Sequence, residues 1–236
     1  MIAENLRIVE QGICSACEAA GRRRDEVKLI AVSKTKPESD ILEAYRCGIR
    51  DFGENKVQEL LRKKEVLPED IRWHLIGHLQ TNKVRQIVGN SCLIHSVDSV
   101  RLADTIDTES AKKGIVTDAL LEVNVGREPT KYGFAPEIDA EVLERFAQYR
   151  HLRIRGLMTV APAAENPMEN AAVFRCLRLL AVDIAAKNID NMSMDFLSMG
   201  MTGDYAAAIQ EGATFVRIGT AIFGSRVYKE NENGSI

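Results

Sequence analysis

The chain has 236 residues, with 31 lysines and arginines, 34 aspartates and glutamates, and a formal net charge of −3. A chain of this size buries roughly 70% of the surface that it exposes when unfolded, so it can hold a core without disulfides. The slightly acidic balance argues against a nucleic-acid-binding or membrane-surface protein, which usually carries a basic surplus. No apolar run approaches the roughly 18 residues that a membrane span needs. We therefore expect a globular protein that binds neither nucleic acid nor a membrane.

The five cysteines are scattered along the chain. Such an odd, dispersed set is typical of a reducing compartment, so we expect a cytoplasmic protein. The N-terminus lacks the basic region, apolar core and cleavage site of a signal peptide. Cys14 and Cys17 form a C-x-x-C pair, but they lie in an expected helix and no second pair completes a zinc site. We expect no metal.

Short β-rich runs alternate with helical patterns from residue 27 onward. The predicted strands are 27–33, 51–53, 73–77, 93–97, 119–125, 153–159, 194–198 and 214–219. The predicted helices between them are 39–47, 56–65, 82–88, 99–113, 138–149, 168–186 and 205–211. This alternation predicts parallel strands joined by right-handed crossovers.

Eight strands in a chain of 236 residues favour one α/β domain, a (β/α)8 or TIM barrel. The alternative is an open doubly wound sheet. It is less favoured because the polar residues follow strand after strand instead of collecting at one switch point. We expect 1–26 to form an extra N-terminal helix, 27–224 the barrel, and 225–236 a tail.

Lys34 is the first candidate for chemistry. It follows the apolar run Leu29-Ile30-Ala31-Val32, which places it at the barrel mouth, where the sites of TIM barrels lie. A partly desolvated lysine is deprotonated more easily, as Schiff-base chemistry requires. The alternative is a lysine whose amine simply extends into solvent.

Two loops form the second candidate site. TIM barrels often bind phosphate with the loops after strands seven and eight. Here these loops are SMGMTG at 198–203 and Gly219-Thr220. The alternative is that the glycines only make turns. Together with Lys34, the loops predict either a pyridoxal phosphate site or a Schiff-base aldolase for a sugar phosphate.

The histidines carry a weaker signal. His74 and His78 are four residues apart, but Leu75 replaces the glutamate of the zinc-protease motif, and the segment is a predicted strand. His78 is near a strand end and is a minor candidate for lining the mouth. We expect His95 and His151 to be structural.

A set of short motifs runs in order along nearly the whole chain. They are LIAVSKTKP at 29–37, FGEN at 52–55, WHLIGHLQTNK at 73–83, HSVD at 95–98, KYGF at 131–134, GLM at 156–158, LSMGM at 197–201 and VRIGTAIFG at 216–224. In these motifs the chain resembles the pyridoxal phosphate homeostasis protein family. Thr202 is a departure, because a serine is commoner there in the family.

The resemblance implies a single barrel like the N-terminal domain of alanine racemase, with pyridoxal phosphate held as a Schiff base on Lys34. It implies that the phosphate is held by Ser198, Gly219 and Thr220 with the backbone of Met199 and Gly200, that Arg217 faces the pyridine nitrogen, and that Asn55 and Met158 line the ring.

The residues favour a carrier over an enzyme. Racemisation requires a base on each face of the substrate's α-carbon, and Lys34 supplies one. In alanine racemase-like enzymes the other comes from a C-terminal domain, for which we expect no room after Gly224. The guanidinium of Arg217 would also keep the ring nitrogen unprotonated and weaken the ring as an electron sink.

We therefore expect a monomeric, non-catalytic protein that buffers pyridoxal phosphate in the cell and passes it to apo-enzymes that depend on this cofactor. The alternative is a pyridoxal phosphate-dependent racemase or decarboxylase-like enzyme of low activity.

Overall fold

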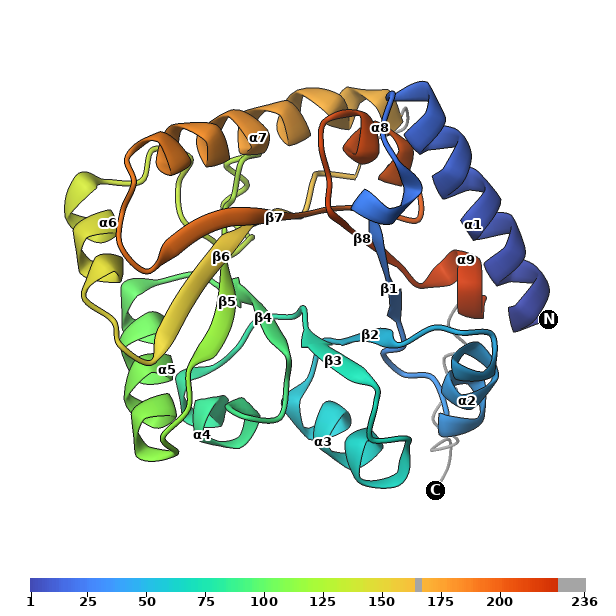
Figure 1. The fold of residues 1–236 in the computed structure, drawn as a ribbon, viewed down its shortest axis with the longest axis horizontal. Helices are drawn as coiled ribbons and strands as arrows, with labels where there is room; N and C mark the ends of the chain where they lie inside the picture. The colour runs from blue at the N-terminus through green and yellow to red at the C-terminus, as the bar shows by residue number, and fades with distance from the viewer. Residues whose placement is uncertain (164–166, 225–236) are drawn as a thin grey trace, which may run out of the picture.

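The computed structural model describes residues 1–163 and 167–224, and the predicted tail at 225–236 lies outside the described residues. Eight parallel strands form a closed barrel in chain order, in which β1 also pairs with β8 (Figure 1). The predicted (β/α)8 barrel is thus confirmed, and the open sheet is excluded. The strands are β1 (Lys28–Val32), β2 (Asp51–Glu54), β3 (Arg72–Leu75), β4 (Leu93–Val97), β5 (Thr117–Glu122), β6 (Leu152–Met158), β7 (Met192–Met201) and β8 (Phe215–Ile218).

Helices surround the barrel. They are α1 (Ile2–Ala19), α2 (Glu38–Arg46), α3 (Val57–Val66), α4 (Val84–Ile87), α5 (Val100–Lys112), α6 (Ala140–Ala147), α7 (Ala171–Ala186), α8 (Tyr205–Gln210) and α9 (Thr220–Phe223), with 3-10 turns η1 (Arg24–Glu26), η2 (Thr81–Lys83) and η3 (Pro167–Asn170). The helix predicted at 82–88 is shorter than expected, because η2 takes up its first part. No helix in the described part of the chain has the length and apolar character that crossing a membrane requires.

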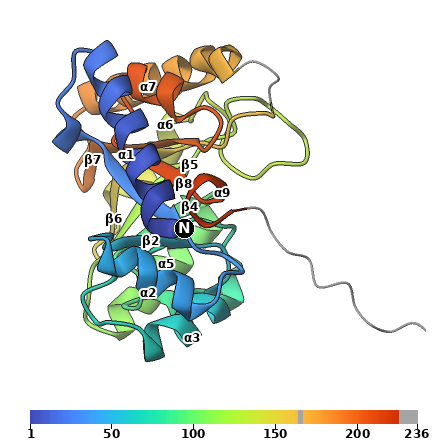
Figure 2. The ribbon, with the colours of Figure 1, turned by 90° about the vertical axis from the view of Figure 1, so that its right-hand side faces the viewer.

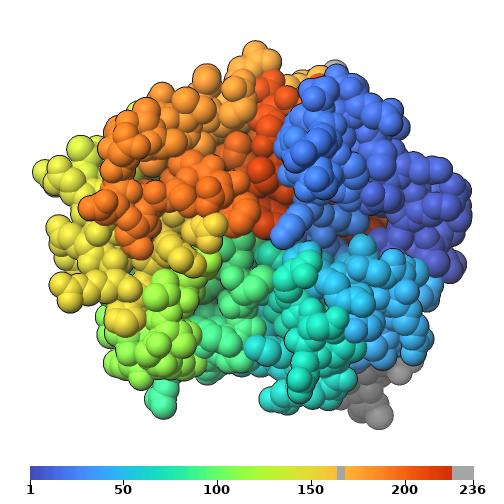
Figure 3. Space-filling model, viewed as in Figure 1, coloured from blue at the N-terminus to red at the C-terminus, as the bar shows by residue number. Residues whose placement is uncertain are grey.

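The extra N-terminal helix is present and closes the barrel's outer layer. Leu6, Val9 and Ile13 lie on one buried face of α1, at the spacing of an amphipathic helix. This face packs against α8 and α9, so the first helix lies beside the last ones (Figure 1). In the space-filling view the N-terminal segment meets the C-terminal elements, and the chain completes a ring (Figure 3).

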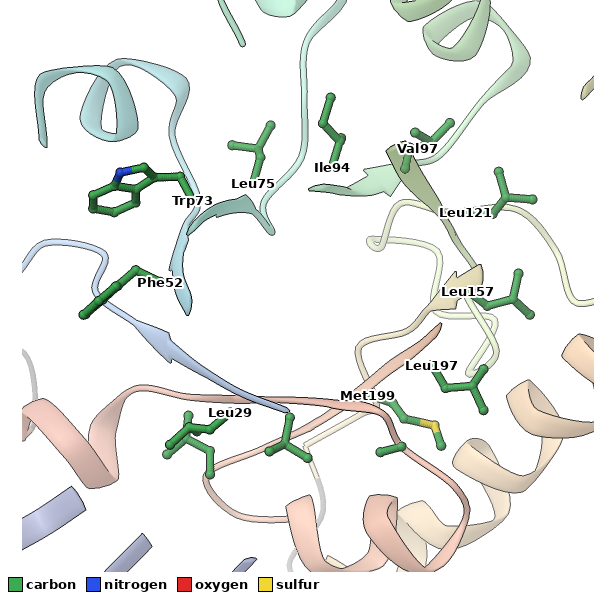
Figure 4. Close-up of a cluster of buried hydrophobic side chains, with 14 of the residues drawn as sticks. Leu29, Phe52, Trp73, Leu75, Ile94, Val97, Leu121, Leu157, Leu197 and Met199 are labelled. Atoms are coloured by element: carbon green, nitrogen blue, oxygen red, sulfur yellow. The ribbon is translucent and has the colours of Figure 1, made fainter. Parts of the chain in front are cut away.

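Two apolar clusters form the core. In the larger one, strand side chains such as Phe52, Leu121 and Leu197 point away from the centre of the ring toward the helices (Figure 4). Because successive side chains of a strand point to opposite faces, their neighbours point into the barrel. The smaller cluster, which includes Leu120 and Phe215, lies in this interior.

The structure corrects the predicted end of strand seven. The sequence predicted a strand ending at Ser198 and a loop from there to Gly203. This was wrong, because β7 continues to Met201, with a register shift against β8 between Ser198 and Met201. Gly200 permits this irregularity: its φ is +88°, and a Cβ there would lie 2.6 Å from the Cβ of Ala208. The turn after β7 therefore begins only at Thr202.

Candidate functional site

A cavity of about 460 Å³ opens at the ends of the strands, a size typical of small-molecule sites. Its lining residues come from the last positions of the strands and from the positions that follow them. They are Val32, Lys34, Asn55, Ile76, Val160, Met201, Thr202, Gly203, Arg217, Gly219 and Thr220. The cavity is therefore the mouth of the barrel, where the sites of this fold lie.

Lys34 sits in a strained turn at the rim of this cavity. The N–H of Lys36 donates to the carbonyl of Ser33 at 3.0 Å, which closes the turn. Thr35 has a φ of +65°, which is rare for a β-branched residue and stores strain. The N–H of Thr35 donates to Glu59 Oε1 at 2.7 Å. The turn thus holds Lys34 in one place next to the cavity.

A fully buried lysine lies behind this turn. Lys63 Nζ is 2.8 Å from the carbonyl oxygen of Ser33 and 2.7 Å from Oε1 of both Glu54 and Glu59. Ser33 Oγ also donates to Glu54 Oε1 at 2.7 Å. Burial raises the pKa of Glu54, and the Lys63 charge opposes that effect. This ion cluster fastens the Lys34 turn to β2 and α3.

Sequence analysis missed the ion cluster. The signal that the sequence offered was the spacing of Glu59 and Lys63, which lie four residues apart on one helix face. That spacing is common on solvated helices, so it did not indicate a buried role.

Arg217 forms the floor of the cavity. Its Nη1 donates to Ser198 Oγ at 2.7 Å, and its Nη2 donates to the carbonyl of Thr159 at 2.8 Å. The side chain is buried, and it forms no ion pair with any residue that the structure describes. Burial lowers the pKa of Arg217 to about 10. A buried cation that lacks a carboxylate partner and lines a cavity is suited to a ligand with an electron-rich acceptor.

The predicted site residues divide into two groups. Lys34, Asn55, Arg217, Gly219 and Thr220 all line the cavity. The others do not: Met158 is buried in the barrel interior, Ser198 bonds to Arg217 beneath the cavity, Met199 points outward to the helices, and Gly200 packs against α8.

Thr202 and Gly203 also line the cavity, in the turn after β7. Both belong to the loop at 198–203 that the sequence analysis predicted for the phosphate, although neither was among the residues to which the family resemblance assigned a role. The minor candidate His78 lies elsewhere, where its Nδ1 is 2.8 Å from Asp98 Oδ2 and its ring stacks on Tyr132.

Glu122 is another group that sequence analysis missed. It is the last residue of β5, and burial raises its pKa to about 7. The charge of Asp98 also raises the pKa, whereas the charge of Arg217 lowers it. The carboxyl group therefore lies near enough to Arg217 to interact with it electrostatically. Glu122 does not line the cavity itself, but a strongly raised carboxyl pKa beside a specific charged group is a frequent feature of functional sites.

A second hollow of about 440 Å³ adjoins the cavity and shares Met201 and Gly203 with it. Lys131 lies on its wall, with Nζ 3.3 Å from the carbonyl of Val160 and 3.2 Å from that of Ala161. The segment between β5 and α6, which carries Lys131, projects beside this end of the barrel (Figure 2). The space available to a ligand thus extends sideways beyond the cavity.

Comparisons with known proteins agree with this geometry. Residues 15–227 match the family model of the alanine racemase N-terminal domain. The pyridoxal phosphate homeostasis protein of Aquifex aeolicus is 46% identical over 226 residues, which cover 95% of this chain and 98% of the relative. The protein of the same name from Pseudomonas aeruginosa is 44% identical over 229 residues, covering 96% of each chain.

Solved structures give the same result. PipY of Synechococcus elongatus, solved with pyridoxal phosphate bound, is 37% identical, with a TM-score of 0.81 over 95% of this chain and 100% of that one. An alanine racemase from Clostridium difficile, at 13% identity and a TM-score of 0.70 over 97% of this chain and 58% of that one, shares the fold alone. This chain belongs to the pyridoxal phosphate homeostasis protein family, within the fold family of the alanine racemase N-terminal domain.

Proposed function

We propose that the protein binds pyridoxal phosphate in the barrel mouth and serves as a buffer and carrier of this cofactor. The observation that carries the proposal is the pairing of Lys34 and buried Arg217 in one cavity. The names of the relatives and the bound ligand of PipY support it. The cytoplasmic location, the monomeric state and the transfer to apo-enzymes are parts of the same proposal.

The residues in the cavity fit the chemical groups of this cofactor. When bound, pyridoxal phosphate supplies an aldehyde that an amine can link covalently and a ring that withdraws electrons. The Lys34 amine would hold the aldehyde carbon, and an Arg217 N–H would donate to the ring nitrogen. The hydroxyl of Thr220 would help to hold the phosphate, with the backbone of Gly219.

Gly219 has a structural reason to be glycine. A Cβ at this position would lie 3.1 Å from the carbonyl oxygen of Val32 and 3.2 Å from its Cβ, a tight contact. The bare backbone leaves its N–H open to an anion at close range. Thr202 and Gly203 follow β7, the strand next to β8, and line the same cavity, so we include them in the proposed phosphate site.

The same lining residues support a carrier over a racemase. Among the described residues that line the cavity, Lys34 is the one side chain that could act as a base, and Glu122, which lies near Arg217, is not part of the lining. A racemase needs two, on opposite faces of the α-carbon. Arg217 remains a cation at neutral pH, because its pKa is lowered only to about 10. A cation beside the ring nitrogen disfavours its protonation and so weakens the electron sink.

A borohydride trap tests the binding proposal. The protein is incubated with pyridoxal phosphate, reduced and digested, and the modified peptide is located by mass. We expect the pyridoxyl group on Lys34. Its absence, or a spread over surface lysines such as Lys64, would contradict the proposal.

Proton exchange separates carrier from enzyme. The loaded protein is incubated with amino acids in deuterated water, and exchange of the α-proton is followed by NMR. A carrier exchanges it no faster than free pyridoxal phosphate does. Exchange well above that background would favour the alternative, a racemase-like or decarboxylase-like enzyme.

A further inference from the structure

A row of hydrogen bonds crosses the barrel interior beneath Arg217. Asp51 Oδ1 is 3.0 Å from His74 Nε2, and His74 Nδ1 is 2.9 Å from His95 Nε2. His95 Nδ1 is 2.9 Å from Ser198 Oγ, which accepts from Arg217 Nη1 at 2.7 Å. All of these side chains are buried. Below, Asp51, His74, His95 and Ser198 are called the interior chain.

The interior chain is unusual for its location. The inside of a (β/α)8 barrel is normally filled by branched apolar side chains. Here two imidazoles occupy it, and each packs against the ring of Phe215 in a T-shaped arrangement. The ring centroid of Phe215 is 5.6 Å from that of His74 and 5.7 Å from that of His95. Burying such polar groups is unfavourable unless each has a partner. Every nitrogen of both rings has one.

The interior chain has a negative charge at one end and meets a positive charge at the other. At the lower end Asp51 accepts from Arg72, whose Nε is 2.7 Å from Asp51 Oδ1. At the upper end Arg217 lines the cavity. The interior chain thus joins a carboxylate at the base of the barrel to the cation at the floor of the cavity.

These ends fix the direction of every hydrogen bond. A guanidinium can only donate and a carboxylate can only accept. Ser198 Oγ accepts from Arg217, so its own hydrogen is available to His95 Nδ1. His95 then donates from Nε2 to His74 Nδ1, and His74 donates from Nε2 to Asp51. The reverse order would leave His74 Nε2 without a hydrogen opposite the carboxylate.

Both rings should therefore be neutral and carry their hydrogen on Nε2. Burial lowers the pKa of His74, and it lowers the pKa of His95 well below the usual value, which agrees with neutral rings. The charged groups that act on them are Asp51, Arg72 and Lys28 for His74, and Arg217 for His95, besides the two histidines' action on each other.

We propose that the interior chain positions Arg217 for the ligand. Hydrogen bonds that point the same way polarise one another. Along the interior chain, a group that donates a hydrogen bond becomes more electron-rich at its own acceptor atom. The effect starts with His74, which donates to Asp51, and passes through His95 to Ser198. Ser198 Oγ thereby becomes a stronger acceptor for Arg217, which forms no ion pair with a described carboxylate, although the charges of Glu122 and Asp204 act on it from farther away. His74 and His95 are positioning residues, since neither lines the cavity.

This inference rests on the proposed function, because it assigns Arg217 to the ring nitrogen of pyridoxal phosphate. If the hydrogen bonds of the interior chain are weakened, the Arg217 guanidinium should be held less firmly in position. The strength of the hydrogen bond that it donates to the ring nitrogen should then change. The result would appear in the absorption spectrum of the bound cofactor as well as in its affinity.

The first test uses the ligand-free protein. The sequence has four histidines, His74, His78, His95 and His151, so their side-chain nitrogens can be assigned by ¹⁵N NMR. We expect His74 and His95 to be Nε2–H tautomers that do not titrate between pH 8 and pH 6. Asp51→Asn should shift the signals of both rings. An Nδ1–H tautomer, or titration of either ring near pH 6.5, would overturn the interior chain as described.

The second test adds pyridoxal phosphate. Asp51→Asn should weaken binding about 3-fold and His95→Leu about 10-fold, in line with the loss of part or all of one hydrogen bond, and both should shift the absorption band. His95→Gln, whose amide can both donate and accept, should restore most of the wild-type spectrum. Phe215→Leu perturbs the same interior without touching the hydrogen bonds, and its spectrum should match the wild type.

The outcomes separate the two proposals. Equal spectra for Asp51→Asn, His95→Leu and the wild type would overturn the positioning role. If His95→Leu fails to fold, Asp51→Asn decides the question alone. Failure of the wild-type protein to form an adduct on Lys34 would instead overturn the proposed function, and the tautomers of the ligand-free protein would be unaffected by it.

Discussion

Arg217 and Lys34 reach one cavity from the last and the first strand of the barrel. β8 pairs with β1 in parallel, and Arg217 lies opposite Ile30, four residues before Lys34. Arg217 is therefore held inside the barrel, whereas Lys34 stands in the turn at its rim. A ligand that contacts both must enter the mouth of the closed barrel, since only barrel closure brings these residues together.

Lys34→Ala should abolish the borohydride-trapped adduct. Pyridoxal phosphate would then bind only through its phosphate and ring, so we expect its affinity to fall at least about 10-fold, as for the loss of a strong contact. Mass spectrometry and a binding titration measure the two effects. Lys36→Ala is the matched control, because Lys36 Nζ bonds to the carbonyl of Phe223. An adduct that persists in Lys34→Ala would rule out this lysine.

Arg217→Glu should change the spectrum of the bound cofactor. A carboxylate next to the ring nitrogen favours the protonated ring, whereas the guanidinium disfavours it. We expect a shifted absorption band and an affinity about 10-fold lower, because a glutamate cannot donate the hydrogen bonds that hold Arg217 to Ser198 Oγ and to the carbonyl of Thr159. Arg217→Gln, which removes the charge without reversing it, should fall between the two. If neither spectrum nor affinity changes, Arg217 is not at the ring.

Lys63→Met should destabilise the protein strongly. It leaves the buried Glu54 carboxylate without its cation, a loss worth about 3 kcal/mol or more in other proteins. Urea unfolding measures it. Lys64→Met, at the next position of α3 on its exposed side, should change stability by less than about 0.5 kcal/mol. Equal effects of the two substitutions would show that the ion cluster contributes nothing.

Glu122→Gln should stabilise the protein at high pH. The pKa of Glu122 is raised to about 7 in the folded state, so the folded protein binds this proton more tightly than the unfolded chain does. The wild type therefore loses stability as the pH rises through 7, and the substitution removes that loss. Unfolding at pH 5 and pH 8 should show a gain for the variant of about 2 kcal/mol at the higher pH. A difference independent of pH would contradict the raised pKa.

His95→Gln should make the free energy of unfolding depend less on pH below pH 7. Burial lowers the pKa of His95 well below 6.5, so the unfolded chain takes up a proton that the folded protein does not. The wild type therefore loses stability as the pH falls below 6.5. Relative to His95→Gln, that loss should grow steadily between pH 7 and pH 5. Parallel profiles for the two proteins would mean that His95 titrates normally in the folded state.

The alternation of elements was sufficient to predict the barrel. Strands such as β1, with the run Leu29-Ile30-Ala31-Val32, are buried on both faces, so they are almost continuously apolar, and helical patterns separate them. The ends of those strands also directed attention to Lys34, Gly219 and Thr220, because a closed barrel brings all strand ends to one mouth. Local periodicity and topology thus predicted part of the cavity lining, whereas Asn55 and Arg217 were named from the family resemblance.

The interior chain could not be predicted in this way. His95 and Ser198 are 103 residues apart in the chain and 2.9 Å apart in space. His95 was expected to be structural, and Ser198 was placed at the phosphate. Their contact depends on barrel closure, which brings the inward-facing side chains of β4 and β7 together across the interior, and no local pattern encodes that contact.

The sequence by itself determined the barrel, the family and the lysine at its mouth, because these depend on the order and spacing of residues along the chain. Only the tertiary structure decided which buried polar groups meet. It placed Lys63 beneath the Lys34 turn and two neutral histidines beneath Arg217. The reason is physical: burial obliges each polar group to find a partner, and the closed barrel alone determines which partners are within reach.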